Sequence, residues 1–213
     1  MQTDELIDSL ACDVAVVPRA EPQRRLALTA IAGGLIAFVL VAVWLGLRPD
    51  LAEAISGDVF WIKAGYTLAL AGAFFYAAER LSRPGVAAGR AWALALAIVA
   101  AFAGLGLMQW VAMPAAHQLA AIQGVSWRVC TRNILVLGAP TTLICVMSMR
   151  GLAPTRPMAA GFAAGAFSGA VAASVYGLHC PEAPYIFTAI WYTLGVGACG
   201  GLGAILGRWL LRW

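Results

Sequence analysis

The segment Met158–Leu178, MAAGFAAGAFSGAVAASVYGL, carries no charged residue and is long enough to cross a lipid bilayer as one helix. A helix rises about 1.5 Å per residue, so about 20 apolar residues span a hydrocarbon core of about 30 Å. Gly161, Gly165 and Gly169 recur every fourth residue, which places them on one face of that helix. Small residues at this spacing let membrane helices approach closely, so the pattern predicts a helix-packing face.

The same spacing returns near the C-terminus, where Gly197 pairs with Gly201 and Gly203 pairs with Gly207. We interpret these pairs as packing positions as well. The string GACGGLG lies inside an apolar segment with no preceding strand, so it does not indicate a nucleotide-binding loop.

The whole chain has the composition of an integral membrane protein. Of its 213 residues, 62% are hydrophobic and 11% are charged, and the mean hydropathy is +0.84. A soluble domain is about 25% charged, and a core of this size could not bury so much apolar surface. The net charge of +4 therefore reports membrane topology rather than nucleic-acid binding. We expect no secretory signal peptide, because the first apolar run exceeds the usual length of about 7–15 residues.

The hydropathy pattern predicts an all-α fold, with a six-helix transmembrane domain over residues 26–213 and a cytoplasmic N-terminal segment over residues 1–25. The fourth helix is the weakest, because Arg132 and Asn133 lie at its start and Pro140 lies inside it. Proline is tolerated in membrane helices, and we expect it to kink this one. The predicted spans are Leu26–Leu47, Val59–Ala78, Ala91–Val111, Thr131–Met149, Met158–Leu178 and Pro184–Leu206.

The positive charges predict the orientation of these spans. The chain has 14 Lys and Arg residues, and most of them fall in the N-terminal segment, the second and fourth connections and the C-terminus. Cytoplasmic loops carry the excess of positive charge, so both termini are expected in the cytoplasm. The other side receives Arg48, Lys63, Arg128 and Arg132. Lys63 lies about one turn inside its helix, and we expect its side chain to snorkel to the outer surface.

This orientation places most of the reactive side chains on the extracytoplasmic side: His117, Cys130, His179, Cys180 and Glu182. Cys130 and Cys180 each lie at the outer mouth of a helix, where they would face an oxidising compartment in a Gram-negative bacterium. They could form a structural disulfide, act as a reactive or metal-binding pair, or be unrelated. The sequence alone leaves these three alternatives open.

The remaining cysteines are assigned differently. Cys145 and Cys199 lie within apolar helices, where cysteine usually packs as a small hydrophobic residue. Cys12 lies in the cytoplasmic segment.

The sequence does not favour an enzyme. It contains no Cys-X-X-Cys pair, no HEXXH motif and no Asp or Glu in the middle of a span. We expect no catalytic residue and no cofactor. The competing function is a small transporter or thiol-redox carrier that acts directly on metals.

The N-terminal segment MQTDELIDSLACDVAVVPRAEPQRR predicts a short acidic amphipathic helix on a tether. Apolar residues recur at helical spacing, acidic residues mark the other side, and Pro18 ends the pattern. Such a helix could cap the bundle or dock into a groove of a soluble partner. The residues expected to bind the partner are Asp4, Glu5, Leu6, Ile7 and Leu10.

Three elements, TDELIDSLACD, RPMAAG and LHCPE followed by WY, together resemble the NrsF family, and the resemblance covers most of the chain. Members of that family are six-span inner-membrane negative regulators of extracytoplasmic-function sigma factors. The resemblance implies an anti-sigma factor that holds its sigma factor at the membrane and releases it under heavy-metal or oxidative stress. The sensing residues that it implies are Cys130 and Cys180, which could also bind the metal. We assign possible auxiliary roles to His179, Glu182 and His117, with loop packing or capping as the alternative for His179 and Glu182.

Overall fold

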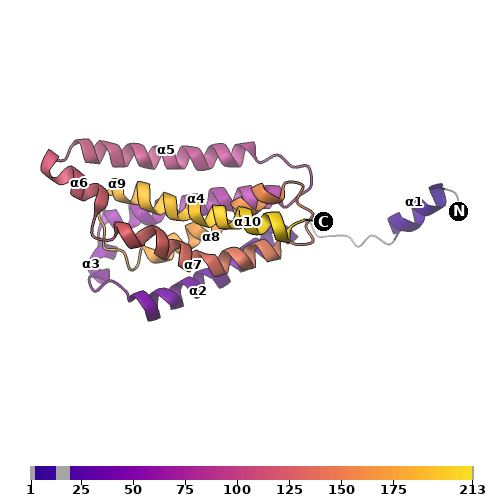
Figure 1. Ribbon diagram of the computed structural model, residues 1–213, viewed down its shortest axis with the longest axis horizontal. Helices are drawn as coiled ribbons and strands as arrows, with labels where there is room; N and C mark the ends of the chain where they lie inside the picture. The colour runs from indigo at the N-terminus through magenta and orange to yellow at the C-terminus, as the bar shows by residue number, and fades with distance from the viewer. Residues whose placement is uncertain (1–2, 13–19, 213) are drawn as a thin grey trace.

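The computed structural model describes residues 3–12 and 20–212, and every regular element in those ranges is helical. Long helices lie side by side in one bundle (Figure 1). The helices are α1 (Thr3–Cys12), α2 (Glu21–Leu40), α3 (Leu51–Ser56), α4 (Asp58–Leu81), α5 (Gly89–Val111), α6 (Ala115–Gln123), α7 (Trp127–Ser148), α8 (Pro157–Tyr176), α9 (Tyr185–Phe187) and α10 (Thr193–Leu210). Two π-helical turns, η1 (Val41–Leu45) and η2 (Thr188–Tyr192), continue α2 and precede α10.

Six helical stretches are long and apolar enough to cross a bilayer, which confirms the predicted fold class. The stretches are Glu21–Leu45, Asp58–Leu81, Gly89–Val111, Ala115–Ser148, Pro157–Tyr176 and Tyr185–Leu210. The prediction missed the short helices α3 and α6, which lie in connections. Helix α2 also begins before the predicted boundary at Leu26, and α7 begins before Thr131 and runs through Pro140 as one helix.

Helix α8 forms the centre of the bundle and packs against α2, α4, α7 and α10. Its closest neighbour is α10, and glycines make that approach possible. A Cβ atom at Gly165 would overlap the carbonyl oxygen of Cys199, and one at Gly161 would overlap the carbonyl oxygen of Gly203. The predicted packing role is therefore confirmed for these glycines and for Gly203, whose position meets the backbone of α8.

The predicted role is wrong for Gly197 and Gly201. A Cβ atom at either position would meet no heavy atom within 4 Å outside the local helix. Both lie on the side of α10 that faces away from α8, because the close contact with α8 is made by Cys199, Gly203 and Gly207. The four-residue spacing alone could not distinguish these two faces of one glycine-rich helix.

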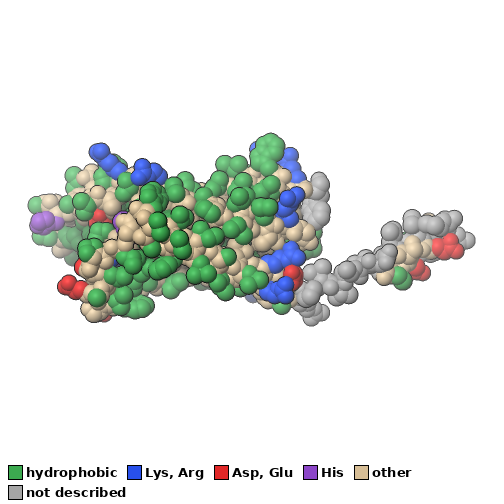
Figure 2. All heavy atoms as spheres, turned by 90° about the horizontal axis from the view of Figure 1, so that it is seen from below, with side chains coloured by type: hydrophobic (Ala, Val, Ile, Leu, Met, Phe, Trp, Pro, Cys, Tyr) green, Lys and Arg blue, Asp and Glu red, His purple; other side chains and the backbone are tan. Residues whose placement is uncertain are grey.

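Arginines gather at one end of the bundle, where α2 and α8 begin and α4, α7 and α10 end. Figure 2 shows this basic end opposite the end that carries the histidines. Arg25 Nη1 donates to the carbonyl oxygens of Ser148 and Arg150 at 3.2 and 3.3 Å. This contact joins the start of α2 to the end of α7 and places a cation where the dipole of α7 is negative.

The predicted N-terminal helix is present as α1. Its Glu5 and Ile7 side chains are exposed, and Ile7 exposes 56% of its surface. The side chains of Asp4, Leu6 and Leu10 lie outside the described residues, as does Pro18.

The contact between α8 and α10 gives a stability prediction. Gly165→Ala places a methyl group against the Cys199 carbonyl, and overpacking of this kind costs about 1–3 kcal/mol. We expect a lower temperature of thermal unfolding in detergent. Gly201→Ala is the matched control, because its Cβ enters open space, and it should not destabilise the protein. Equal unfolding temperatures for the two variants would contradict the packing assignment.

Candidate functional site: a buried thiol pair

Cys130 and Cys180 meet inside the end of the bundle opposite the basic end. Cys130 lies in the first turn of α7, and Cys180 lies in the connection that follows α8. The Cys130 and Cys180 side chains lie within hydrogen-bonding reach of each other, and both are free thiols. Both side chains are 0% exposed, so the expectation that they face outward is wrong. The connection over residues 177–184 lies across this end of the bundle, where it contacts α4, the turn before α7 and Gly46; we call it the covering connection.

Lys63 does not snorkel to the surface, which corrects the sequence prediction. Its side chain is buried, and Nζ donates to the carbonyl oxygen of Glu182 at 2.6 Å. The ammonium also lies 5.5 Å from the centre of the Tyr192 ring. These two contacts take the place of water around the Lys63 ammonium. The covering connection supplies the Glu182 carbonyl at a position where the sequence predicts solvent.

The neighbouring groups make Cys180 the more acidic member of the pair. The hydrogen bond from Cys130 lowers the pKa of Cys180, burial opposes this effect, and the Lys63 ammonium lowers the pKa further. Within the described ranges no carboxylate forms an ion pair with Lys63. A Cys180 thiolate would therefore be the anion that balances the Lys63 ammonium.

Glu182 caps helix α7. Its Oε1 accepts hydrogen bonds from the backbone N–H groups of Val125 and Ser126 at 2.7 and 2.9 Å, and from the Ser126 hydroxyl at 3.0 Å. Gly124 has φ +54° and lies so close to the carboxylate that a Cβ atom would overlap it. An acceptor with negative charge stabilises a helix N-terminus, which explains why α7 begins earlier than predicted. Of the two roles considered for Glu182, the contacts match capping.

His179 joins the covering connection to the end of the first span. Its Nδ1 lies 2.8 Å from the carbonyl oxygen of Gly46, and its ring packs 5.6 Å from the Tyr176 ring. The backbone N–H of Arg48 donates to the Leu178 carbonyl at 3.1 Å and reinforces this junction. His117 lies exposed on α6, outside the cluster.

Several buried polar atoms surround the thiols. Among the described residues these include Asn133 Oδ1, Tyr176 Oη and Tyr192 Oη. Both tyrosine hydroxyls act electrostatically on the thiols, so they lie beside them. Polar side chains are costly inside a membrane bundle and are often functional there.

The π-helical turn η2 places Tyr192 at the site. Such turns insert an extra residue into a helix and often occur at functional sites. The Thr131 hydroxyl donates to the Trp191 carbonyl at 3.1 Å, which ties η2 to α7 next to Cys130. Trp191 itself is held by a hydrogen bond of 2.9 Å from Nε1 to the Ile122 carbonyl.

The thiol pair does not form a complete metal site by itself. In the part of the chain that the structure describes, no group of three or more His, Cys, Asp or Glu side chains could hold a metal ion. Two thiols remain able to bind one soft ion as a pair.

Comparison with known proteins decides the family. The family model described as "Negative regulator of sigma F" matches residues 10–213. The chain belongs to the NrsF family. It is 50% identical, over the full length of both chains, to a Caulobacter vibrioides protein named "Anti-sigma-F factor NrsF". It is 38% identical over both full lengths to an Azospira oryzae protein named "Probable anti-sigma-F factor NrsF". No solved structure matches the chain.

In this NrsF-family chain, sequence reasoning singled out the two cysteines but missed their polar neighbours. Lys63 carried the best signal, because it is the lysine within a predicted span. Its burial depends on the connection over residues 177–184, whose path the sequence does not reveal. Tyr176 and Tyr192 flank the LHCPE element and gave no separate signal.

The position of Lys63 predicts how Cys180 responds to pH. Lys63→Met removes the ammonium, so the pKa of Cys180 should rise, because the cation no longer stabilises the thiolate. The rate of Cys180 modification by methyl methanethiosulfonate, followed by mass spectrometry, should then reach its midpoint at a pH about one unit higher. Arg128→Gln removes a cation at the same end and should leave the midpoint unchanged. An unchanged midpoint in Lys63→Met would contradict the assignment.

Proposed function

We propose that this chain is a membrane-bound anti-sigma factor that responds to oxidants or thiol-binding metals through Cys130 and Cys180. It holds an extracytoplasmic-function sigma factor at the bacterial inner membrane and releases it under stress. The observation that carries this proposal is the meeting of two free thiols beside a buried lysine, in a chain of the NrsF family. The family supports the anti-sigma activity, and the thiol geometry supports the sensing.

The positive charges support the orientation in this proposal. The basic end of the bundle carries the start of α2 and the end of α10, so both ends of the transmembrane domain share it. Positive residues favour the cytoplasmic side, which supports a position of the thiol pair near the extracytoplasmic surface. The sensor and the partner-binding surface then lie on opposite sides of the membrane.

Either stress signal removes the same charge. Oxidation joins the two sulfur atoms: the Cys180 thiolate and the Cys130 thiol together release one proton and give two electrons to a quinone or a peroxide. A soft divalent ion instead displaces the Cys130 proton and binds both thiolates, and the resulting complex has no net charge. Both products leave the Lys63 ammonium without a counter-charge in an apolar bundle, which costs several kcal/mol.

This cost can act on the bundle through several helices. Lys63 belongs to α4, Cys130 belongs to α7, and Cys180 lies between α8 and α10. A displaced ammonium would break the bond to the Glu182 carbonyl and loosen the covering connection. The glycine-lined contact of α8 with α10 reaches the basic end, so a shift there would alter the cytoplasmic surface.

The output surface in this proposal consists of α1 and the basic end of the bundle. Ile7 offers an exposed apolar anchor, and acidic Glu5 and Asp8 lie exposed on the same helix. Amphipathic helices of this kind dock their apolar face into a groove of the partner.

The output is tested by recovery of the sigma factor from detergent-solubilised membranes. Deletion of residues 2–18 preserves α2, which begins at Glu21, and should abolish recovery. Ile7→Glu should weaken binding about tenfold or more, because it puts a charge on the docking face. Ser9→Glu adds the same charge about 200° around the helix and should bind like the unmodified chain. If the deletion variant still recovers the sigma factor, α1 is not the binding element. If no chain recovers it, liposome transport of metals becomes the test of the competing carrier function.

The input is tested in cells with a reporter of sigma-factor activity. Cys130→Ser combined with Cys180→Ser should abolish induction by cadmium or by the thiol oxidant diamide, since neither a disulfide nor a thiolate complex can form. Cys12→Ser changes an exposed cysteine outside the bundle and serves as the control. Normal induction in the double variant would remove the sensing half of the proposal.

A further inference from the structure

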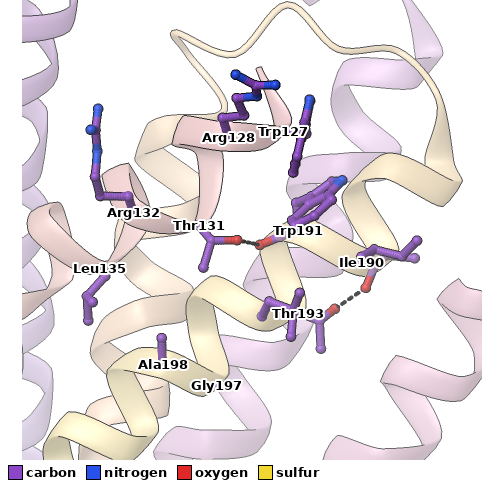
Figure 3. A pocket seen from close by; sticks show the side chains of 12 residues that line it. Trp127, Arg128, Thr131, Arg132, Leu135, Ile190, Trp191, Thr193, Gly197 and Ala198 are labelled. Atoms are coloured by element: carbon purple, nitrogen blue, oxygen red, sulfur yellow. Dashed lines mark hydrogen bonds between the residues drawn. The ribbon is translucent and has the colours of Figure 1, made fainter. Parts of the chain in front are cut away.

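An apolar groove runs along the outside of the bundle between α7 and the η2–α10 helix. Its volume is about 920 Å³, within the size range of ligand sites. Figure 3 shows Trp127 and Trp191 near one end of the groove and Leu135 and Ala198 further along it. Leu194 lines it and is 52% exposed, so the groove opens toward the surrounding bilayer.

Two cations stand at the end of this groove. Arg128 and Arg132 line it from successive turns of α7, and both are exposed. Figure 3 shows the two side chains extending to the same side, beyond the apolar part of the groove. The Arg128 guanidinium lies 5.1 Å from the Trp127 ring, and no carboxylate in the described ranges pairs with either arginine. The groove thus joins an apolar slot to an unbalanced double positive charge.

We propose that this groove binds an anionic phospholipid. One acyl chain lies in the slot beside Leu135, Leu194 and Gly197, and the phosphate group lies on Arg128 and Arg132. Guanidinium groups bind phosphate oxygens through paired hydrogen bonds, and tryptophans such as Trp127 favour the level of the lipid head groups. A second copy of this chain is the less suitable occupant, because it would bring a further pair of like charges to the same contact.

The lipid site shares a wall with the thiol pair. Thr131 and Trp191 line the groove and are joined by a hydrogen bond of 3.1 Å, while their sequence neighbours Cys130 and Tyr192 lie at the thiol pair. A bound lipid would brace α7 against η2 at this point. The proposal concerns binding alone and stands independently of the anti-sigma function.

Native mass spectrometry of the detergent-solubilised full chain tests the proposal. We expect dioleoylphosphatidylglycerol to bind about tenfold more tightly than dioleoylphosphatidylcholine, because only the former carries a net negative charge. Arg128→Gln combined with Arg132→Gln should abolish this preference. Arg90→Gln combined with Arg156→Gln removes the same charge at the basic end and should preserve it.

The acyl-chain slot is tested separately. Gly197→Leu places a side chain into the open groove and should weaken binding of both lipids, whereas Gly201→Leu, one turn along α10 and outside the groove, should not. Equal affinity for the two lipids, or a preference unaffected by the arginine variant, would overturn the proposal. So would a dimer that dissociates on Gly197→Leu. If Gly197→Leu fails to fold, the lipid preference of the variant with Arg128→Gln and Arg132→Gln decides the outcome alone.

Discussion

The close contact of α8 with α10 is the constraint on which the rest of the structure depends. Apolar side chains gain little by leaving lipid for protein, so membrane helices associate through tight backbone packing instead. Gly161 and Gly165 permit that packing because neither position has space for a methyl group. The connection between the two helices contains Cys180, so their approach also determines where this thiol lies. Cys130 is brought to the same place by α7, which packs against both helices.

The polar cluster around the thiol pair, at the end of the bundle opposite the basic end, is a second consequence of this arrangement. The connection over residues 177–184 closes over the helix ends and supplies the carbonyl that accepts from Lys63, the carboxylate that caps α7, and the thiol itself. One short segment therefore touches α4, α7 and the end of the first span. Chemistry at Cys180 would change contacts with several helices at once, which is what a signalling device in a membrane requires.

The sequence predicted the spans, and it located Cys130 and Cys180 at the mouths of helices, because both depend on local signals. Apolar runs of sufficient length define membrane helices, and LHCPE marks the mouth of one of them. Burial could not be predicted, because it depends on the path of a connection with no periodic pattern. Lys63 was therefore placed at the surface, and Gly197 was placed in a packing face that it does not join. The spacing of residues along a helix gives the face on which each residue lies. It does not show which other helix, if any, packs against that face.

The proposed coupling between the thiol pair and sigma-factor binding is tested most directly by measuring the affinity of the sigma factor for the full chain in nanodiscs before and after oxidation with diamide. Mass spectrometry would confirm a disulfide between Cys130 and Cys180, and reduction would provide the reverse step. We expect the affinity to fall about tenfold or more on oxidation and to recover on reduction, because loss of the thiolate leaves the Lys63 ammonium unbalanced. Formation of that disulfide with no change in affinity would show that the thiol pair does not control the sigma factor.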